Sequence, residues 1–276
     1  MNRGILLYAN NNAKCDYIKQ AYALALSIKI KNAKEKVALV TSEDVQYTIF
    51  DEIIKIPANT SLTHLHSENR VGFYDITPFD ETIVMDVDML VTQDMTQYWN
   101  YLSNFNLYFT TNTFTYRNKS IQSNYYRKMF TENNLPNVYC AFYYFKKNKE
   151  KSTYHFFNLQ NEINSKWEIF YKRYAPKRTQ KWPSMDVSSS IAMKILGLED
   201  VSTDRHSIIE VTHLKPMLQE FVKTPDRCSQ YFNTYVDTKG DVYVGNFKQK
   251  GILHYVEQEM MTDKNIQCME EIYGSI

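Results

Sequence analysis

The fold of this chain is constrained most strongly by a regular alternation of short apolar runs and amphipathic stretches near its N-terminus. Residues 4–9, 36–41 and 82–85 are apolar runs, and residues 16–30 repeat apolar side chains at helical spacing. Short apolar runs are typical of buried strands, and their alternation with helices is typical of a parallel sheet covered on both faces. The sequence therefore predicts an α/β fold, in which ligands bind beyond the carboxyl ends of the strands.

Further elements and the number of domains follow from the same patterns. Hydrophobic spacing predicts helices at residues 44–50, 70–78 and 186–196 and a strand at residues 52–56. No stretch resembles a linker rich in Pro, Gly or Ser, and the sequence shows no internal repeat. We therefore expect a single domain over residues 1–276.

Several classes of protein do not fit this sequence. No apolar run approaches the roughly 20 residues that a membrane helix needs, and the N-terminus lacks the small-residue cleavage site of a secretion signal. The cysteines are scattered without a Cys-x-x-Cys pair, so we expect neither a disulfide framework nor a cysteine zinc site. We therefore expect no membrane partner and a cytoplasmic location, which is the host cytoplasm if a bacteriophage encodes the chain.

The charge of the chain is unevenly distributed. Residues 117–181 carry 14 Lys and Arg against 4 Asp and Glu, whereas the rest of the chain carries 18 against 27. Tyrosines and tryptophans are interleaved with these basic residues, which allows two interpretations: a solvated helix face over core aromatics, or a surface for a polyanion. On the second interpretation the acceptor-binding residues are Arg127, Lys128, Lys172, Arg173, Lys177 and Arg178. Residues 117–181 are therefore expected to form a basic, aromatic-rich elaboration of the domain.

Asp86 and Asp88 are the best-placed polar pair in the sequence. They follow the apolar run at residues 82–85 and precede another at residues 89–91, so two carboxylates interrupt a stretch that is otherwise suited to burial. Unpaired carboxylates there would repel each other and lose solvation, and a hard divalent cation such as Mg²⁺ or Mn²⁺ removes both problems. The alternative is a turn that carries two solvated acids.

The segment Glu81–Val91, with the sequence ETIVMDVDMLV, resembles the Asp-x-Asp strand of GT-A glycosyltransferases. The resemblance is strongest to the glycogenin and galactosyltransferase-like family, glycosyltransferase family 8. Segments similar to other parts of that family follow in its order over residues 4–255: Tyr17–Ser27, Arg70, Pro136–Lys146, Ser184–Asp186 and Lys250–Tyr255. The resemblance implies a GT-A fold, which is a Rossmann-like, mixed and mostly parallel sheet flanked by helices.

The resemblance also implies roles for individual residues. A nucleotide-sugar donor would contact Tyr8, Ala9, Asn10, Tyr17, Arg70, Asp86, Val87 and Asp88. Mn²⁺, or Mg²⁺, would be held by Asp86, Asp88 and His254, and imidazole together with carboxylates suits Mn²⁺ better than Mg²⁺. Catalytic roles fall to Arg70, at the developing charge of the diphosphate, and to Asp186, at the sugar or acceptor side.

The sugar and acceptor side departs from the family pattern. Residues 139–141 are Tyr-Cys-Ala where the family has Asn-x-Gly, and Val187 follows Asp186 where the family has Gln. Asp186 also begins a helical stretch, so capping of that helix is its alternative role.

The third metal ligand is open between two histidines. The terminal Lys-Pro-Trp of the family is missing after His254, whereas Lys215 and a proline follow His213. His213 therefore competes with His254 for the position beside the two aspartates.

Together these features predict a metal-dependent glycosyltransferase, either a hexosyl- or a pentosyltransferase, that moves a sugar from a nucleotide sugar to a hydroxyl acceptor. The favoured donor is a UDP-sugar. The basic segment adds nucleic acid as an acceptor, for example a hydroxylated base in DNA, and the richness in Lys, Asn, Ile and Tyr is typical of an AT-rich genome such as that of a bacteriophage.

Two other functions remain as alternatives. A nucleotidyltransferase also uses paired aspartates and a divalent metal, but it usually has a glycine-rich basic loop after the first strand, where this chain has three asparagines at residues 10–12. A non-catalytic module that binds a nucleotide or a nucleic acid on the same fold is the second alternative, and the altered residues 139–141 point to it.

Overall fold

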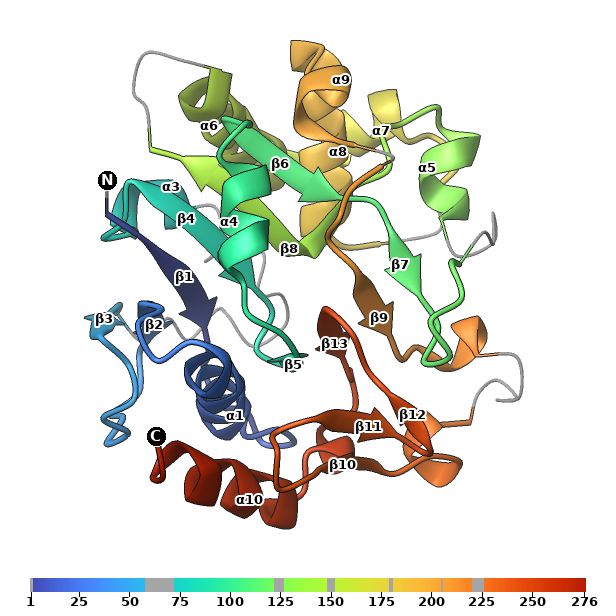
Figure 1. Ribbon diagram of the computed structural model, residues 1–276. Helices are drawn as coiled ribbons and strands as arrows, with labels where there is room; N and C mark the ends of the chain where they lie inside the picture. The colour runs from blue at the N-terminus through green and yellow to red at the C-terminus, as the bar shows by residue number, and fades with distance from the viewer. Residues whose placement is uncertain are drawn as a thin grey trace.

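A six-stranded sheet forms the centre of the structure (Figure 1). The computed structural model describes residues 2–57, 72–121, 127–147, 152–178, 181–204, 206–219 and 226–276. In spatial order the strands are β3 (Glu52–Lys55), β2 (Val37–Thr41), β1 (Arg3–Tyr8), β4 (Glu81–Met85), β8 (Tyr139–Lys146) and β6 (Leu107–Thr110). The first four run parallel, and β8 runs antiparallel to both of its neighbours. The predicted α/β class with a mixed, mostly parallel sheet is confirmed.

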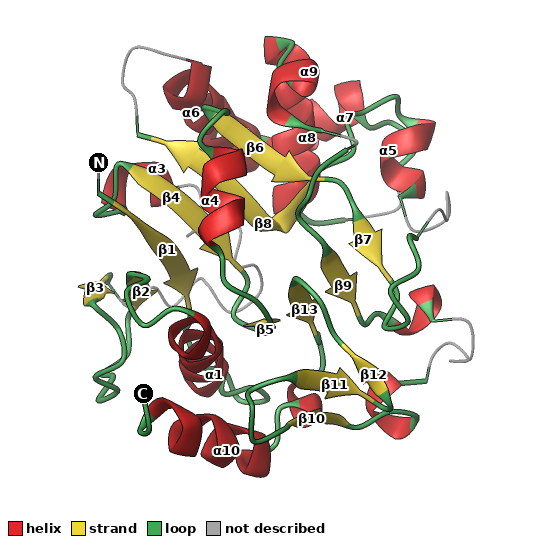
Figure 2. Cartoon of the chain, in the orientation of Figure 1, coloured by secondary structure: helices red, strands yellow, loops and turns green. Residues whose placement is uncertain are grey.

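Both faces of this sheet are covered by other elements. Alternate residues of β1 enter different buried clusters: Ile5 and Leu7 pack with residues of α1 and α4, and Leu6 packs with residues of α6, α7 and α8. Figure 2 shows α4 in front of the strands and α8 behind them. The helices of the described residues are α1 (Tyr17–Lys31), α3 (Phe73–Ile76), α4 (Thr96–Leu102), α5 (Lys128–Glu132), α6 (Ser152–Ser165), α7 (Trp167–Tyr174), α8 (Met185–Leu196), α9 (Glu199–Ser202) and α10 (Asp263–Tyr273). Burial on two sides explains why the strands are continuous apolar runs.

Two smaller sheets complete the described part of the chain. The first is four-stranded, in the order β5 (Met89–Val91), β13 (Ile252–His254), β9 (Val211–His213) and β7 (Thr113–Phe114). The second is three-stranded, in the order β10 (Thr234–Val236), β11 (Val242–Val244) and β12 (Phe247–Lys248). Because β5 follows directly after β4, its antiparallel pairing with β13 brings the C-terminal part of the chain beside the turn at residues 86–88.

Most elements predicted from the sequence are present. The confirmed ones are the strands at residues 4–9, 36–41, 52–56 and 82–85 and the helices at residues 16–30 and 186–196. The helix expected at residues 70–78 is described only from residue 72 onward, and there α3 ends at Ile76, before Pro78. Among the residues that the structure describes, no helix combines the length and the apolar character needed to cross a membrane.

The helix predicted at residues 44–50 is wrong. These residues are all described, and they form turns and irregular backbone. The ring of Tyr47 stacks on that of Tyr22 in α1, with centroids 4.0 Å apart, and Ile49 and Phe50 are buried. The segment is short and contains several β-branched residues, which are weak helix formers, so packing against α1 decides its conformation.

Candidate functional site

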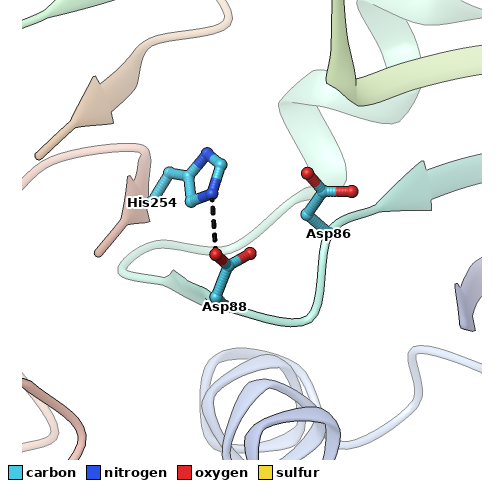
Figure 3. A group of neighbouring side chains, drawn as sticks. All are labelled: Asp86, Asp88 and His254. Carbon is cyan, nitrogen blue, oxygen red and sulfur yellow. Dashed lines mark ion pairs between the residues drawn. The ribbon is translucent and has the colours of Figure 1, made fainter. Parts of the chain in front are cut away.

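Asp86, Asp88 and His254 lie together at the carboxyl end of β4 (Figure 3). Each offers one ligand atom, and these atoms all lie within 4.8 Å of one another. His254 Nε2 is 3.1 Å from Asp88 Oδ2. The backbone N–H of Asp86 donates to the carbonyl of Ala141 in β8 at 2.9 Å, which holds the first carboxylate in place. The two neighbouring strands therefore fix the geometry of this group.

The chemistry of these three side chains fits a divalent cation. Asp86 Oδ1 is shielded from solvent, and Asp88 lies close by with a second negative charge. Two carboxylates so close together repel each other and lose solvation when they are buried. A set of carboxylate oxygens and one imidazole nitrogen suits Mn²⁺, and also Mg²⁺.

The two candidate histidines occupy different places. His254 lies with the carboxylates, whereas His213 stacks on His254 with ring centroids 4.7 Å apart, on the side of β9. Burial lowers the pKa of His254, but the carboxylates of Asp88 and Asp86 more than offset this and raise its pKa above the usual value. Burial holds the pKa of His213 well below the usual value, and the positive charges around it lower it further. Because His254 lies beside both carboxylates, its position and not its pKa makes it better placed than His213 as the third ligand.

Tyr139 connects the two histidines. It is the first residue of β8, is buried, and its hydroxyl is 2.7 Å from Nδ1 of His213. The same hydroxyl contacts Nδ1 of His254. Both imidazoles are thus held through Nδ1, which leaves Nε2 of His254 directed at the carboxylates.

A cavity of about 370 Å³ opens beside Asp86. Asp186 and Arg127 stand in its wall, 3.3 Å apart between Oδ2 and Nη1, and Asp186 Oδ1 also accepts a hydrogen bond from the backbone N–H of Cys140 at 2.8 Å. The lining residues are Asp86, Arg127, Met129, Phe130, Tyr139, Cys140, Ala141, Ser184, Met185, Asp186, Val187, His213, Lys215 and His254. Ser184 occupies the N-cap position of α8, so the alternative role of Asp186 as N-cap is wrong.

Three of the residues predicted to contact the nucleotide, Tyr8, Ala9 and Asn10, lie at the end of β1. Because β1 and β4 are parallel neighbours, the end of β1 lies at the same edge of the sheet as Asp86. The side chain of Asn10 donates to the hydroxyl of Tyr8 at 2.9 Å and accepts from the backbone N–H of Ser42 at 2.8 Å. Ala9 is almost fully buried.

Tyr17 lies near the second aspartate at the start of α1. Burial raises the pKa of Tyr17 to about 12, and the Cys15 thiol and the Asp88 carboxylate contribute to this increase. Its ring is half-buried, whereas the side chain of Val87 packs fully into the core. Tyr17 therefore offers an aromatic surface close to the group of Asp86, Asp88 and His254.

The remaining sequence-predicted site residues are Arg70 and the six basic residues proposed to bind the acceptor. Arg70 lies outside the described residues. Of the proposed acceptor-binding residues, Arg127 lines the cavity, Lys128, Lys172, Arg173 and Lys177 are exposed, and Arg178 packs over the rings of Trp167 and Tyr171. The basic residues thus divide between one cavity residue and a set on the surface of α5, α7 and the following turn.

The cavity also contains residues that sequence reasoning missed. Met129 and Phe130 line it from α5, and the guanidinium carbon of Arg127 lies 4.2 Å from the ring centroid of Phe130. They carry no motif that could mark them in the sequence. Lys215 also lines the cavity, and its position two residues after His213 was the available signal.

Comparison with known proteins identifies the fold. The sequence matches no protein-family model, and no curated protein matches it. The structure is similar to that of galactosyltransferase LgtC in complex with donor and acceptor sugar analogs, with a TM-score of 0.55 and 13% identity over 99% of this chain and 96% of LgtC. It is also similar to mouse xyloside xylosyltransferase 1, with a TM-score of 0.51 and 11% identity over 89% of this chain and 98% of that one.

A further match covers less of the other protein. The glycosyltransferase GlyE of Streptococcus pneumoniae TIGR4 aligns with a TM-score of 0.43 and 16% identity over 74% of this chain, which spans 46% of the GlyE chain. The full-length similarities have low sequence identity and therefore show the fold alone. By that evidence the chain has the mixed α/β fold of GT-A glycosyltransferases, with a mostly parallel central sheet flanked by helices.

Proposed function

We propose that this protein is a metal-dependent glycosyltransferase that moves a sugar from a nucleotide sugar, with a UDP-sugar as the favoured donor, to a hydroxyl acceptor. The observation that carries the proposal is the convergence of Asp86, Asp88 and His254 beside a cavity of about 370 Å³. This group lies at the carboxyl end of the central sheet, where open α/β sheets bind their ligands.

The residues of the site have separate tasks in this proposal. Asp86, Asp88 and His254 would hold Mn²⁺ or Mg²⁺, and a bound ion would supply positive charge to the diphosphate leaving group. Tyr8, Ala9, Asn10 and Tyr17 lie on the side of β1 and α1, where the base and ribose would bind, and Val87 supports the turn from the core. Arg70 is assigned to the sugar or phosphate by the sequence resemblance.

Asp186 and Arg127 would bind sugar hydroxyls in the cavity. The carboxylate of Asp186 is oriented by the N–H of Cys140 and by the guanidinium of Arg127, so its position is fixed before a sugar arrives. A carboxylate accepts from a hydroxyl and a guanidinium donates to one, and the pair can therefore hold neighbouring hydroxyls of one sugar ring.

The direct test is a panel of UDP-, GDP-, CMP- and TDP-sugars measured by thermal shift with and without Mn²⁺. We expect a UDP-sugar to stabilise the protein only when Mn²⁺ is present. When the ligand concentration is a hundred times Kd, binding adds about 2.7 kcal/mol to the free energy of unfolding. For a chain of this size this raises Tm by about 5–10 °C. No shift with any nucleotide sugar would exclude the proposal.

Product analysis separates the proposal from its rivals. A glycosyltransferase releases a nucleoside diphosphate from the donor, whereas a nucleotidyltransferase releases pyrophosphate from a nucleoside triphosphate. Binding of a nucleotide sugar without turnover would favour a non-catalytic module. The observation that favours this alternative is that Tyr139, Cys140 and both carboxylate oxygens of Asp186 already form contacts within the protein.

For the acceptor we propose a carbohydrate hydroxyl. The similar LgtC structure was solved with donor and acceptor sugar analogs, and the cavity beside Asp86 is walled by polar groups that suit a sugar. Hexosyl or pentosyl transfer would be read directly from the sugar that is consumed in the donor panel.

A nucleic-acid acceptor is the second candidate, and the exposed Lys128, Lys172, Arg173 and Lys177 favour it. If these residues contact about four phosphates of a DNA duplex, affinity falls about a hundredfold between 50 and 200 mM salt. Fluorescence anisotropy with a labelled duplex measures this, and the double variant Lys172→Ala, Arg173→Ala should reduce the salt slope by about 2. Replacing Lys34 and Lys36, which are exposed beside β2, is the matched control. Affinity that does not change with salt would exclude this acceptor.

A further inference from the structure

We propose that Tyr139 and His213 are positioning residues that fix the proton of His254 on Nδ1, so that Nε2 is available to a divalent cation. This inference rests on the proposed function, because the divalent cation is part of that proposal. It concerns residues at which the chain departs from the family pattern, since Tyr139 occupies the first position of the expected Asn-x-Gly.

Three strands bring these side chains together. Tyr139 begins β8, His213 ends β9 and His254 ends β13. Because β9 and β13 pair in parallel with His213 opposite His254, the two imidazoles lie side by side, with an angle of 28° between their planes. The hydroxyl of Tyr139 reaches Nδ1 of both rings, at 2.7 Å for His213.

The number of protons on these groups restricts the arrangement. The phenol of Tyr139 has one proton, so it can donate to only one of the two Nδ1 atoms. For both contacts to be hydrogen bonds, the other imidazole must carry its proton on Nδ1 and donate it to the phenol oxygen. Two arrangements satisfy this condition, and they run in opposite directions along the chain of three residues.

A divalent cation bound to the carboxylates and to His254 would be compatible with only one of the two arrangements. Nε2 of His254 faces Asp88 at 3.1 Å, so this nitrogen is the one that can share its lone pair with a cation held by the carboxylates. A neutral imidazole that coordinates through Nε2 carries its proton on Nδ1. His254 then donates to Tyr139, and Tyr139 donates to Nδ1 of His213, whose own proton is on Nε2.

Burial strengthens both hydrogen bonds whichever way they run, and the direction is set by the position of Nε2 of His254 beside Asp88. His213 is 1% exposed and Tyr139 is 4% exposed, so water does not compete for these hydrogen bonds. Metal-binding histidines commonly donate their second N–H to an oxygen that orients the ring, and loss of that oxygen weakens metal binding about 10- to 100-fold. Here the oxygen is a phenol, and His213 keeps the phenol lone pair turned toward His254.

The first experiment measures Mn²⁺ affinity without nucleotide, from the electron paramagnetic resonance signal of free Mn²⁺. We expect Tyr139→Phe to weaken binding about 10- to 100-fold. His213→Leu should weaken it less, and His213→Asn should restore it, because an amide oxygen can accept from Tyr139. Tyr144→Phe is the matched control, since Tyr144 lies on the same strand as Tyr139 and its hydroxyl donates to Glu81 of β4 at 2.7 Å, away from the site. Thermal melting of each variant verifies that it is folded, and unchanged affinity in folded Tyr139→Phe overturns the proposal.

The second experiment needs no variant. Long-range ¹⁵N–¹H spectra of the protein saturated with diamagnetic Zn²⁺ report which ring nitrogens carry protons. We expect a proton on Nδ1 of His254 and on Nε2 of His213, and a proton on Nδ1 of His213 overturns the inference. If wild type binds Mn²⁺ with this pattern but uses no nucleotide sugar, only the proposed function fails. If wild type binds no divalent cation, both fail.

Discussion

Replacing Asp86 by asparagine is expected to lower Mn²⁺-dependent turnover of a UDP-sugar about a thousandfold. Asparagine has the same shape, so the N–H of residue 86 keeps its bond to the carbonyl of Ala141 and the fold is retained. The substitution removes one negatively charged metal ligand. A metal stabilises the leaving diphosphate by several kcal/mol, and losing this stabilisation lowers the rate by about three powers of ten. Turnover and Mn²⁺ affinity are both measured, so that loss of the metal is seen directly.

Asp80→Asn is the matched control for this substitution. Asp80 lies just before the amino end of the same strand, where its carboxylate accepts from the N–H of Asn2 at 3.0 Å. We expect it to leave turnover and Mn²⁺ affinity unchanged. Melting temperatures without metal should be similar for both variants and the unchanged protein. Full activity in Asp86→Asn, in the presence of normal Mn²⁺ dependence, would remove this aspartate from the metal site.

The central sheet could be predicted because its signal is local. β1, β2 and β4 are buried on both faces, so each contains a run of consecutive apolar residues that marks its own strand. The helix prediction at residues 44–50 was wrong for the opposite reason. Its conformation depends on packing against α1 through Tyr47 and Tyr22, a contact between residues that no periodic pattern relates.

The candidate site was predictable only in part, for a related reason. Asp86 and Asp88 are two residues apart at the end of one strand, so their proximity could be read from the sequence. His254 was named through the resemblance, because its approach depends on the pairing of β13 with β5. The contacts of Arg127 with Asp186 and of Tyr139 with His213 join distant segments, so neither partner could be chosen in advance.

Gly251→Ala is expected to reduce the free energy of unfolding by about 3 kcal/mol, because a left-handed backbone costs an L-residue about 1–2 kcal/mol and the clash adds to this. Gly251 has φ +66°, and an added Cβ would lie 2.4 Å from the carbonyl oxygen of Glu210 and 2.9 Å from the hydroxyl of Tyr98. The carbonyl of Glu210 accepts from the N–H of Ile252 at 2.9 Å, so the clash falls on the start of β13. Urea denaturation measures the loss.

Gly245→Ala separates the two contributions. Gly245 also has a left-handed backbone, with φ +56°, but no atom lies within 4 Å of an added Cβ. We expect this control to lose only about 1–2 kcal/mol, the cost of the backbone conformation alone. Because His254 follows three residues after Gly251, the displaced strand should also weaken Mn²⁺ binding in Gly251→Ala and not in Gly245→Ala. The two variants could instead lose equal amounts of stability and keep their Mn²⁺ affinity. That result would mean that the close approach of Gly251 to the carbonyl of Glu210 does not hold β13 and His254 in place.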